Sequence, residues 1–361
     1  MFFTIRDLRV NKGRFALVGS VIALIALMTT LLSGLANGLV DDGISGLRAL
    51  PLNHLAFGPG AHSTFSRSTL TNDHLEPWLD ADGVEASALG VSLVNAQRSD
   101  GTTIDIALFG VPTDSFLAPR DEARQALKTR GIVLSHEFLN AGVEIGEELT
   151  IVGVDEKLPV LGFTYAGAYG HVDIGFTSLT TWQGLIYGNT PNGRFSAIAL
   201  RSDDTVALTK LATESGTEVV TKTESYQGSP GYAAEQTTMS LIRVFLLAIS
   251  ALIVGAFFTV WTIQRTRQIG LLKALGASDA TVVGELIAQM AIVIVVSTAL
   301  GALIAIGLGQ LASGSAIPFH LEPTPVIQSL VLLIVLGLAG CLAALRRITA
   351  VEPIIALGAE G

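Results

Sequence analysis

The apolar residues of this chain are concentrated in long runs separated by polar segments. Asp, Glu, Lys and Arg are absent from the runs Phe15–Val40, Val244–Gln264, Leu286–Leu321 and Pro323–Leu345. Because about 20 apolar residues in a helix cross the hydrocarbon core of a bilayer, these runs predict four transmembrane helices. The third run contains turn-forming residues at Ala312–His320, which end its helix. We therefore place the helices at residues 15–40, 237–264, 286–312 and 325–345, with a short outer loop at 313–324.

The more polar segment at residues 41–236 predicts a folded α+β domain between the first and second helices. Thr150–Val154 and Val160–Thr164 are typical of strands, with Asp155–Leu158 as the turn of a hairpin. Asp121–Thr129 has charged residues at helical spacing and follows Pro119. The predicted fold class is therefore a membrane protein with four transmembrane α-helices and a large α+β extracytoplasmic domain.

The distribution of charge predicts which segments face the cytoplasm. Residues 41–240 contain 12 Lys and Arg against 25 Asp and Glu, whereas residues 1–14, 265–285 and 346–361 together contain 9 against 5. The positive-inside rule then places both termini and the loop at 265–285 in the cytoplasm, and the domain outside the cell. Residues 1–14 form a weakly amphipathic helix suited to the inner leaflet, and residues 346–361 form a cytoplasmic tail. We expect a multi-pass protein of the cell membrane in contact with lipid.

Several kinds of chemistry have no support in the sequence. It contains no G-x-x-x-x-G-K-[ST] loop for nucleotide phosphates, no H-E-x-x-H zinc motif and no G-x-S-x-G elbow. The single cysteine, Cys341, excludes an intrachain disulfide and is expected to be a core residue. The histidines lack the spacing of metal ligands and are expected in exposed loops: His54, His62, His74, His136, His171 and His320. We therefore expect neither an enzyme nor a permanently bound cofactor, and no nucleic-acid partner.

The loop at residues 265–285 has a helical pattern that suits contact with a partner. Ile269, Leu272 and Leu275 lie on one helical face, and Gly276 is placed to end that helix. Ser278 or Asp279 can then cap the helix that follows. This pattern favours two interpretations, a helix that docks into a groove on a cytoplasmic protein or a linker that contacts only lipid headgroups.

A second candidate site lies where the domain returns to the membrane. Tyr232, Glu235, Met239 and Arg243 share one face of the predicted second helix. A carboxylate or phenolate can bind ferric iron, and Arg pairs with propionate groups, so this set suits an anionic metalloporphyrin. The alternative is structural: Glu235 suits the positive end of the helix dipole, Met239 fills gaps, and Arg243 extends toward the interface.

Two other patterns are expected to serve packing. Tyr165, Tyr169 and His171 form an aromatic cluster that we interpret as ordinary packing and loop structure. Gly34-x-x-x-Gly38 in the first predicted helix either permits close approach of another helix or is tolerated near a helix end.

The stretch R-x-R-x-I-G-L-L-K-A-L-G-A-S-D at residues 265–279 resembles the coupling segment of FtsX-like/MacB-type ABC transporter permeases. The order of helices and domain resembles that family too, as does an R…P…A-L ending at Arg346, Pro353 and Leu357. Gln268 departs from the family, which often has Glu there. The resemblance implies a homodimer bound to two copies of a cytoplasmic ATPase that holds ATP and Mg²⁺ and drives the outer domains by mechanotransmission. The implied coupling residues are Arg267, Ile269, Leu272, Lys273, Leu275, Gly276 and Asp279.

Residues 5–39 and the F-S-R-S stretch at Phe65–Ser68 are similar to the haem-exporter permeases of Gram-positive bacteria. This resemblance implies that haem is the transported substrate and that Glu235 contacts its iron, with Tyr232, Met239 and Arg243 in support. Two alternatives stay open. One is a permease that handles lipoproteins or antimicrobial peptides, and the other is an FtsX-like regulator of cell-wall hydrolases that transports nothing.

Overall fold

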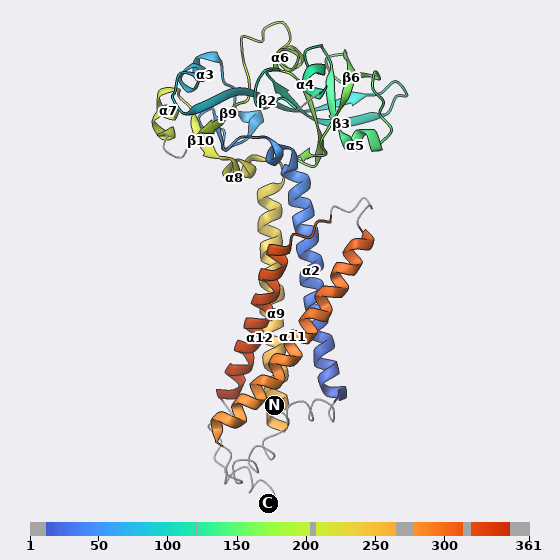
Figure 1. Ribbon diagram of the computed structural model, residues 1–361, viewed down its shortest axis with the longest axis vertical. Helices are drawn as coiled ribbons and strands as arrows, with labels where there is room; N and C mark the ends of the chain where they lie inside the picture. The colour runs from blue at the N-terminus through green and yellow to red at the C-terminus, as the bar shows by residue number, and fades with distance from the viewer. Residues whose placement is uncertain (1–11, 120–121, 203–206, 265–277, 313–318, 347–361) are drawn as a thin grey trace, which may run out of the picture. The chain divides into compact units, whose positions relative to one another are not determined.

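The computed structural model describes residues 12–119, 122–202, 207–264, 278–312 and 319–346. The chain divides into two compact units, which Figure 1 displays. The sheet unit comprises Leu39–Gln236, and the helical unit comprises Met1–Gly38 together with Thr237–Gly361. The boundaries between the two units fall inside two long helices.

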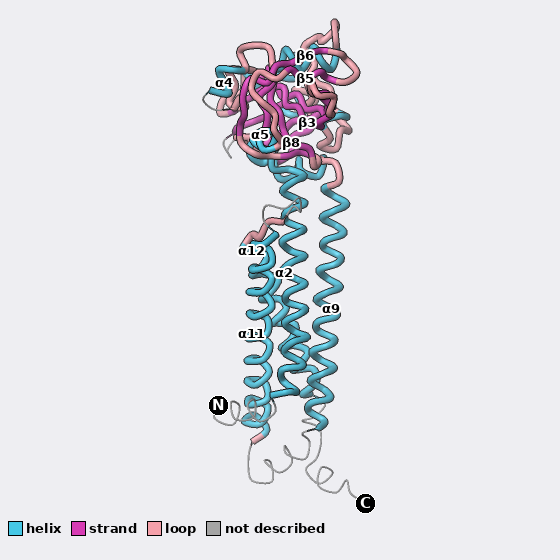
Figure 2. The backbone as a smooth tube through the Cα atoms, turned by 90° about the vertical axis from the view of Figure 1, so that its right-hand side faces the viewer, coloured by secondary structure: helices cyan, strands magenta, loops and turns pink. Residues whose placement is uncertain are grey.

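The described part of the helical unit is built from α2 (Lys12–Ala49), α9 (Tyr232–Gln264), α11 (Asp279–Ala312) and α12 (Pro323–Arg346), which are cyan in Figure 2. Among the described residues, Phe15–Ala49, Tyr232–Phe257 and Gly284–Leu311 are long and apolar enough to cross a membrane. In α12 the described apolar segment, Val326–Leu342, is shorter. Three of the four predicted spans are thus confirmed as candidates, and the fourth stays a prediction.

Small residues allow close packing within the helical unit. A Cβ atom added to Gly301 of α11 would collide with the carbonyl group of Ala23 in α2. Cys341 is fully buried, as predicted, in an apolar cluster that draws on all four helices: Phe15, Val18, Ile22, Val254, Leu286, Met290, Val293, Ile294 and Cys341.

Gly34 makes room for a connecting segment. A Cβ atom at Gly34 would collide with the ring of Phe319, and the Gly34 carbonyl accepts a hydrogen bond from the N–H of His320 at 3.0 Å. The close approach that the glycine permits is therefore to the segment before α12.

The sheet unit contains a mixed sheet of ten strands in the order β10-β1-β9-β2-β3-β8-β4-β6-β5, with β7 beside β8. A further pairing of β5 with β2 closes part of this sheet into a ring. The β3–β8 and β4–β6 pairs are parallel. The strands are β1 (His54–Phe57), β2 (Val84–Gln97), β3 (Thr103–Val111), β4 (Ile132–Ser135), β5 (Glu148–Ile151), β6 (Glu156–Thr164), β7 (Ala168–Tyr169), β8 (Val172–Ser178), β9 (Ala197–Ser202) and β10 (Glu218–Thr221).

Short helices complete the sheet unit and confirm its α+β character. They are η1 (Phe65–Arg67), α3 (Asn72–Leu79), α4 (Glu122–Ala126), α5 (His136–Asn140), α6 (Leu179–Tyr187), α7 (Leu208–Glu214), α8 (Lys222–Ser225) and η2 (Tyr226–Gly228). The predicted helix near residues 121–129 is present as α4. The predicted β5–β6 hairpin is also present, but the predicted position of its turn is wrong. The chain reverses at residues 152–155 because Gly153 and Asp155 adopt positive φ angles of 90° and 54°.

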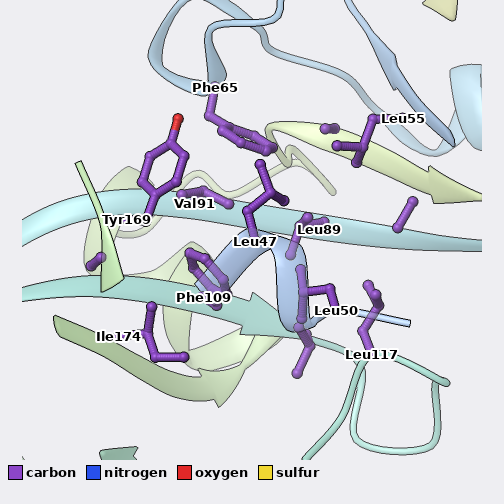
Figure 3. Close-up of a cluster of buried hydrophobic side chains, with 14 of the residues drawn as sticks. Leu47, Leu50, Leu55, Phe65, Leu89, Val91, Phe109, Leu117, Tyr169 and Ile174 are labelled. Atoms are coloured by element: carbon purple, nitrogen blue, oxygen red, sulfur yellow. The ribbon is translucent and has the colours of Figure 1, made fainter. Parts of the chain in front are cut away.

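The last turns of α2 belong to the core of the sheet unit. Leu47 of α2 and Leu50, which directly follows the helix, are buried among Leu89 of β2 and Phe109 of β3 in one apolar cluster, which Figure 3 shows. Phe65, from the F-S-R-S stretch, lies in the same cluster, with its ring centroid 5.6 Å from that of Tyr169. Burial of these side chains fixes the end of α2 to the sheet.

Candidate functional site

Hydrogen bonds join α2 to β7, to the β7–β8 turn and to Ser229, which precedes α9. The carbonyl of Gly43 in α2 accepts one bond from the Ser229 hydroxyl at 2.7 Å and another from the N–H of Gly170 at 2.9 Å. The N–H of Ala168 donates to the Ser45 hydroxyl at 2.8 Å. Ser229 lies just before the start of α9, so the beginning of α9 is held against α2.

Three titratable side chains meet at this junction, and we call them the helix-root triad: Asp42 of α2, His171 of the β7–β8 turn and Glu235 of α9. The His171 Nε2 atom lies 2.9 Å from Oε1 of Glu235, and its Nδ1 atom lies 3.1 Å from Oδ2 of Asp42. An ionised carboxylate can only accept hydrogen bonds, so a ring that bonds both carboxylates must donate from both nitrogens. The geometry therefore favours an imidazolium cation at His171.

The surroundings of the triad shift the pKa of two groups. Burial alone would lower the pKa of His171, but the hydrogen bonds and negative charges of Asp42 and Glu235 outweigh burial and raise it. Burial, with the charges of Glu137 and Asp42, raises the pKa of Asp173 to about 6. Both groups keep a proton to a higher pH than in an unfolded chain.

These shifts predict that the sheet unit loses stability as the pH rises. For Asp173, the loss falls between its ordinary pKa of about 4 and a pKa of about 6. For His171, stability is complete below about pH 6.5 and is lost as the pH rises through the raised pKa. Because the triad is partly exposed, we expect the melting temperature to fall by about 2 °C above pH 6.5, equivalent to less than about 1 kcal/mol.

Thermal unfolding of the full chain in lipid nanodiscs, followed by tryptophan fluorescence at pH 6.5 to 9, measures this change. His171→Gln should flatten the pH dependence, and the exposed His136 provides a matched control in His136→Gln. Equal pH profiles for wild type and His171→Gln would contradict the assignment of the proton to the triad.

Glu235 retains an unused acceptor. Its Oε1 atom bonds His171, whereas its Oε2 atom is buried and has no hydrogen-bond partner among the described residues. Tyr232 has a different environment, since it is 7% exposed, packs against Tyr226, and its hydroxyl accepts a hydrogen bond from Gln236 at 3.2 Å. Of the two, Glu235 offers the free oxygen for a ligand.

Arg243 lines a groove in the helical unit. The groove has a volume of about 290 Å³ and is formed by α2, α9 and α12, with Thr29, Ser240 and Gln328 among its polar lining residues. The Nε atom of Arg243 and the Oγ1 atom of Thr29 are buried without hydrogen-bond partners among the described residues. No ion pair within the described ranges involves Arg243. The groove therefore presents a cation that lacks a counter-charge in this part of the chain.

The predicted site residues Tyr232, Glu235, Met239 and Arg243 all lie on α9, the first two in the sheet unit and the last two in the helical unit. The predicted coupling residues Arg267, Ile269, Leu272, Lys273, Leu275 and Gly276 lie outside the described residues. Asp279 is the first residue of α11, and its side chain is also outside them. The coupling site stays a prediction.

The sequence did not reveal that Asp42 and His171 accompany Glu235. His171 is an exposed turn residue, as predicted, but its ring also bridges two carboxylates. The partners of His171 lie 129 and 64 residues away, so no local spacing connects them.

Comparison with known proteins gives matches over the whole chain. Residues 240–353 match the family described as FtsX-like permease C-terminal. The chain is 24% identical to the "Putative hemin transport system permease protein HrtB" of Staphylococcus haemolyticus over 98% of both chains. It is 23% identical to the protein of the same name from Staphylococcus epidermidis, again over 98% of both. An uncharacterized ABC transporter permease of Mycobacterium tuberculosis is 23% identical over 99% of both.

Two solved structures have lower similarity. The extracellular domain of the noncanonic ABC-type transporter YknZ from Gram-positive bacteria is 15% identical, with a TM-score of 0.34. The match covers 47% of this chain and 98% of that one. The periplasmic region of MacB from Actinobacillus actinomycetemcomitans is 14% identical, with a TM-score of 0.36, and covers 51% of this chain and 95% of that one.

Proposed function

Because the chain carries an FtsX-like permease domain at residues 240–353, we propose that it is the membrane subunit of an ABC-type efflux transporter that exports haem from the membrane. The resemblance to FtsX-like and haem-transport permeases predicted from the sequence is confirmed by the family match and the full-length relatives. Those relatives are named for hemin transport, which supports haem as the substrate of this chain.

The observation that carries the proposal is the groove around Arg243. An ionised side chain within a membrane span is costly, so Arg243 is best explained by a ligand of opposite charge. Haem provides such a charge in its propionates, which pair well with a guanidinium. A volume of about 290 Å³ suits the carboxylate edge of an amphipathic molecule more than a whole macrocycle. The rest of the ring would then lie in lipid.

We further propose that Glu235 contacts the haem iron. Its buried Oε2 atom has no hydrogen-bond partner among the described residues, and an oxygen ligand suits ferric iron. Tyr232 precedes Glu235 by three residues on α9, and its ring lies in the apolar core cluster of the sheet unit. This position favours a role for Tyr232 in supporting Glu235 rather than in binding the iron. Met239 follows one turn later on the same helix.

The energy for export would come from a separate subunit. In the proposed assembly, two copies of this chain bind two cytoplasmic ATPase subunits, which hold ATP and Mg²⁺. The residues 265–285 receive the ATPase, and α2 and α9 carry the resulting movement by mechanotransmission. In this proposal the sheet unit lies outside the cell and both termini lie in the cytoplasm, as the positive-inside rule predicts.

Haem titration of the full chain with its ATPase in nanodiscs tests the proposal. We expect saturable binding, seen as a shift of the Soret band. Arg243→Gln should weaken binding about tenfold, since a charge-assisted hydrogen bond contributes about 1.5–3 kcal/mol. Glu235→Gln should change the position of the Soret band because an iron ligand is altered.

Arg67→Gln provides a matched control, since it removes an exposed arginine from the sheet unit. Absence of haem binding by the assembled complex would refute haem as the substrate. That result would leave the lipoprotein or peptide permease and the non-transporting regulator as the alternatives.

A further inference from the structure

A large cleft in the sheet unit has no role in the proposed transport of haem. It has a volume of about 960 Å³ and lies between the end of α2, the loop at residues 112–119, α4 and the ends of β6 and β9. The lining residues that matter for its chemistry are Glu85, Phe116, Arg124, Phe163, Tyr165 and Arg201. A cleft of this volume is within the range of small-molecule sites.

The loop that forms one wall is ordered by its own hydrogen bonds. The Ser115 hydroxyl donates to the carbonyl of Pro112 at 2.9 Å and accepts from the N–H of Leu117 at 3.2 Å. Nη2 of Arg124 donates to the carbonyl of Ser115 at 3.1 Å. The guanidinium of Arg124 is thus held in place at the cleft by the loop.

Arg124 has donors that the described residues leave unused. Its bond to Ser115 is the one hydrogen bond that the described part of the chain gives its guanidinium, and its Nε atom is buried without a partner there. A guanidinium carries several N–H donors in a planar fork that fits a carboxylate or phosphate. Arg124 can therefore accept an anion without losing an existing ion pair among these residues.

Arg201, the second arginine of the cleft, already has hydrogen-bond partners within the protein. Its Nη1 atom bonds Glu85 at 3.1 Å, and its Nε atom donates to the carbonyl of Pro51 at 2.5 Å. The guanidinium also lies over the ring of Phe116, 4.6 Å from its centroid. Arg201 therefore orients the ring of Phe116, and Arg124 is the group with capacity for a ligand.

Aromatic side chains supply the apolar surface of the cleft. Phe116 and Phe163 are partly buried, and the ring of Tyr165 packs edge-on against Phe176 with a centroid distance of 6.0 Å. Burial raises the pKa of Tyr165, so its hydroxyl keeps its proton and can donate a hydrogen bond. Flat rings beside a cation favour a ligand that is planar and anionic.

We propose that this cleft is a binding site for a small organic anion with a planar, apolar body, whose carboxylate or related acid group pairs with Arg124. Phe116, Phe163 and Tyr165 contact the body of the ligand, and Arg201 holds Phe116 in position. The site lies within the sheet unit and does not depend on the groove at Arg243. It can therefore exist whether or not haem is the transported substrate.

Fluorescein tests the proposal, because it is planar, anionic and soluble in water. The full chain is placed in phosphatidylcholine nanodiscs, and binding is followed by fluorescence anisotropy with empty nanodiscs subtracted. We expect saturable binding by the wild type. Rhodamine 123 has the same ring system with an esterified acid group and a positive charge, and it should not bind saturably. Failure of the wild type to bind fluorescein would overturn the proposal.

Arg124→Gln should weaken fluorescein binding about tenfold, the effect of losing one charged contact. Arg130→Gln removes the same charge from an exposed arginine that pairs with Glu156, and it should change binding less than about twofold. Equal weakening by both variants, or no weakening by Arg124→Gln, would contradict a site at Arg124.

A cysteine placed at the cleft gives a measurement that leaves Arg124 intact. Asp114 is exposed and lines the cleft, and the native Cys341 is buried in the helical unit, so Asp114→Cys introduces a selectively reactive thiol. Saturating fluorescein should slow maleimide labelling of this thiol at least about fivefold, in proportion to site occupancy. Unchanged labelling would overturn the proposed location. Haem titration of the same protein reports separately on the proposed function.

Discussion

Replacing Leu272 with aspartate should reduce the affinity of this chain for the proposed ATPase subunit about a hundredfold, since burying an unpaired charge in an apolar contact costs about 3 kcal/mol or more. The reason is the predicted docking face of Ile269, Leu272 and Leu275, which the sequence places on one side of a helix. Insertion of the chain into the membrane should be unaffected. Co-purification of the ATPase from membranes with equal amounts of each variant measures the loss.

Ala274→Asp is the matched control for Leu272→Asp. On a helix of about 3.6 residues per turn, Ala274 lies on the side opposite the docking face. It adds the same charge to the same loop, so it should leave most of the ATPase bound. Normal recovery of the ATPase with Leu272→Asp would refute the docking interpretation and favour a linker that contacts only lipid headgroups.

Gly228→Ala should lower the free energy of unfolding of the sheet unit by about 3 kcal/mol, the upper end of the usual cost of overpacking. A Cβ atom at this buried position would collide with the backbone carbonyl of Ser63 and lie 2.9 Å from the N–H nitrogen of Thr64. Backbone atoms cannot move aside by changing a rotamer, so the two segments must separate. Chemical unfolding of the full chain in nanodiscs, followed by the fluorescence of Trp78 and Trp182, measures the change.

Gly184→Ala is the control for Gly228→Ala. A Cβ atom at Gly184 in α6 meets no other atom within 4 Å, and alanine favours the helix by up to about 1 kcal/mol. This variant should therefore be neutral or slightly stabilising. A stable Gly228→Ala variant would show that Ser63 and η2 are less closely packed than the structure indicates.

Apolar periodicity predicted the long helices because it reflects a local property of the chain. The charge-free runs that begin at Val244 and Leu286 start within α9 and α11. The predicted ends of these two helices stay predictions, because the described residues stop at Gln264 and Ala312. The end of α2 was harder to predict. Asp41, Asp42 and Arg48 make its last turns polar on one side, whereas Ile44 and Leu47 are buried in the sheet unit on the other. Only the tertiary structure shows that burial extends the helix to Ala49.

For the candidate site, too, some features could be predicted from local sequence and others depend on the tertiary structure. Glu235 and Arg243 precede the apolar run that starts at Val244 and share one helical face, a pattern that is visible in a short window of sequence. The partners of these residues were not visible. His171 reaches Glu235 through the β7–β8 turn, and the groove at Arg243 needs residues of three helices, so both depend on long-range topology. The Arg124 cleft is likewise assembled from distant segments that share no motif.

The hydrogen bond from His320 to Gly34 restricts how α2 can move within the helical unit. A piston stroke of one helical turn along the α2 axis would carry Gly34 about 5.4 Å from its partner and break the bond. A tilt about a pivot at Gly34 would keep the two atoms together. A movement transmitted by α2 would then be a tilt of the helix about Gly34 rather than a translation along its axis.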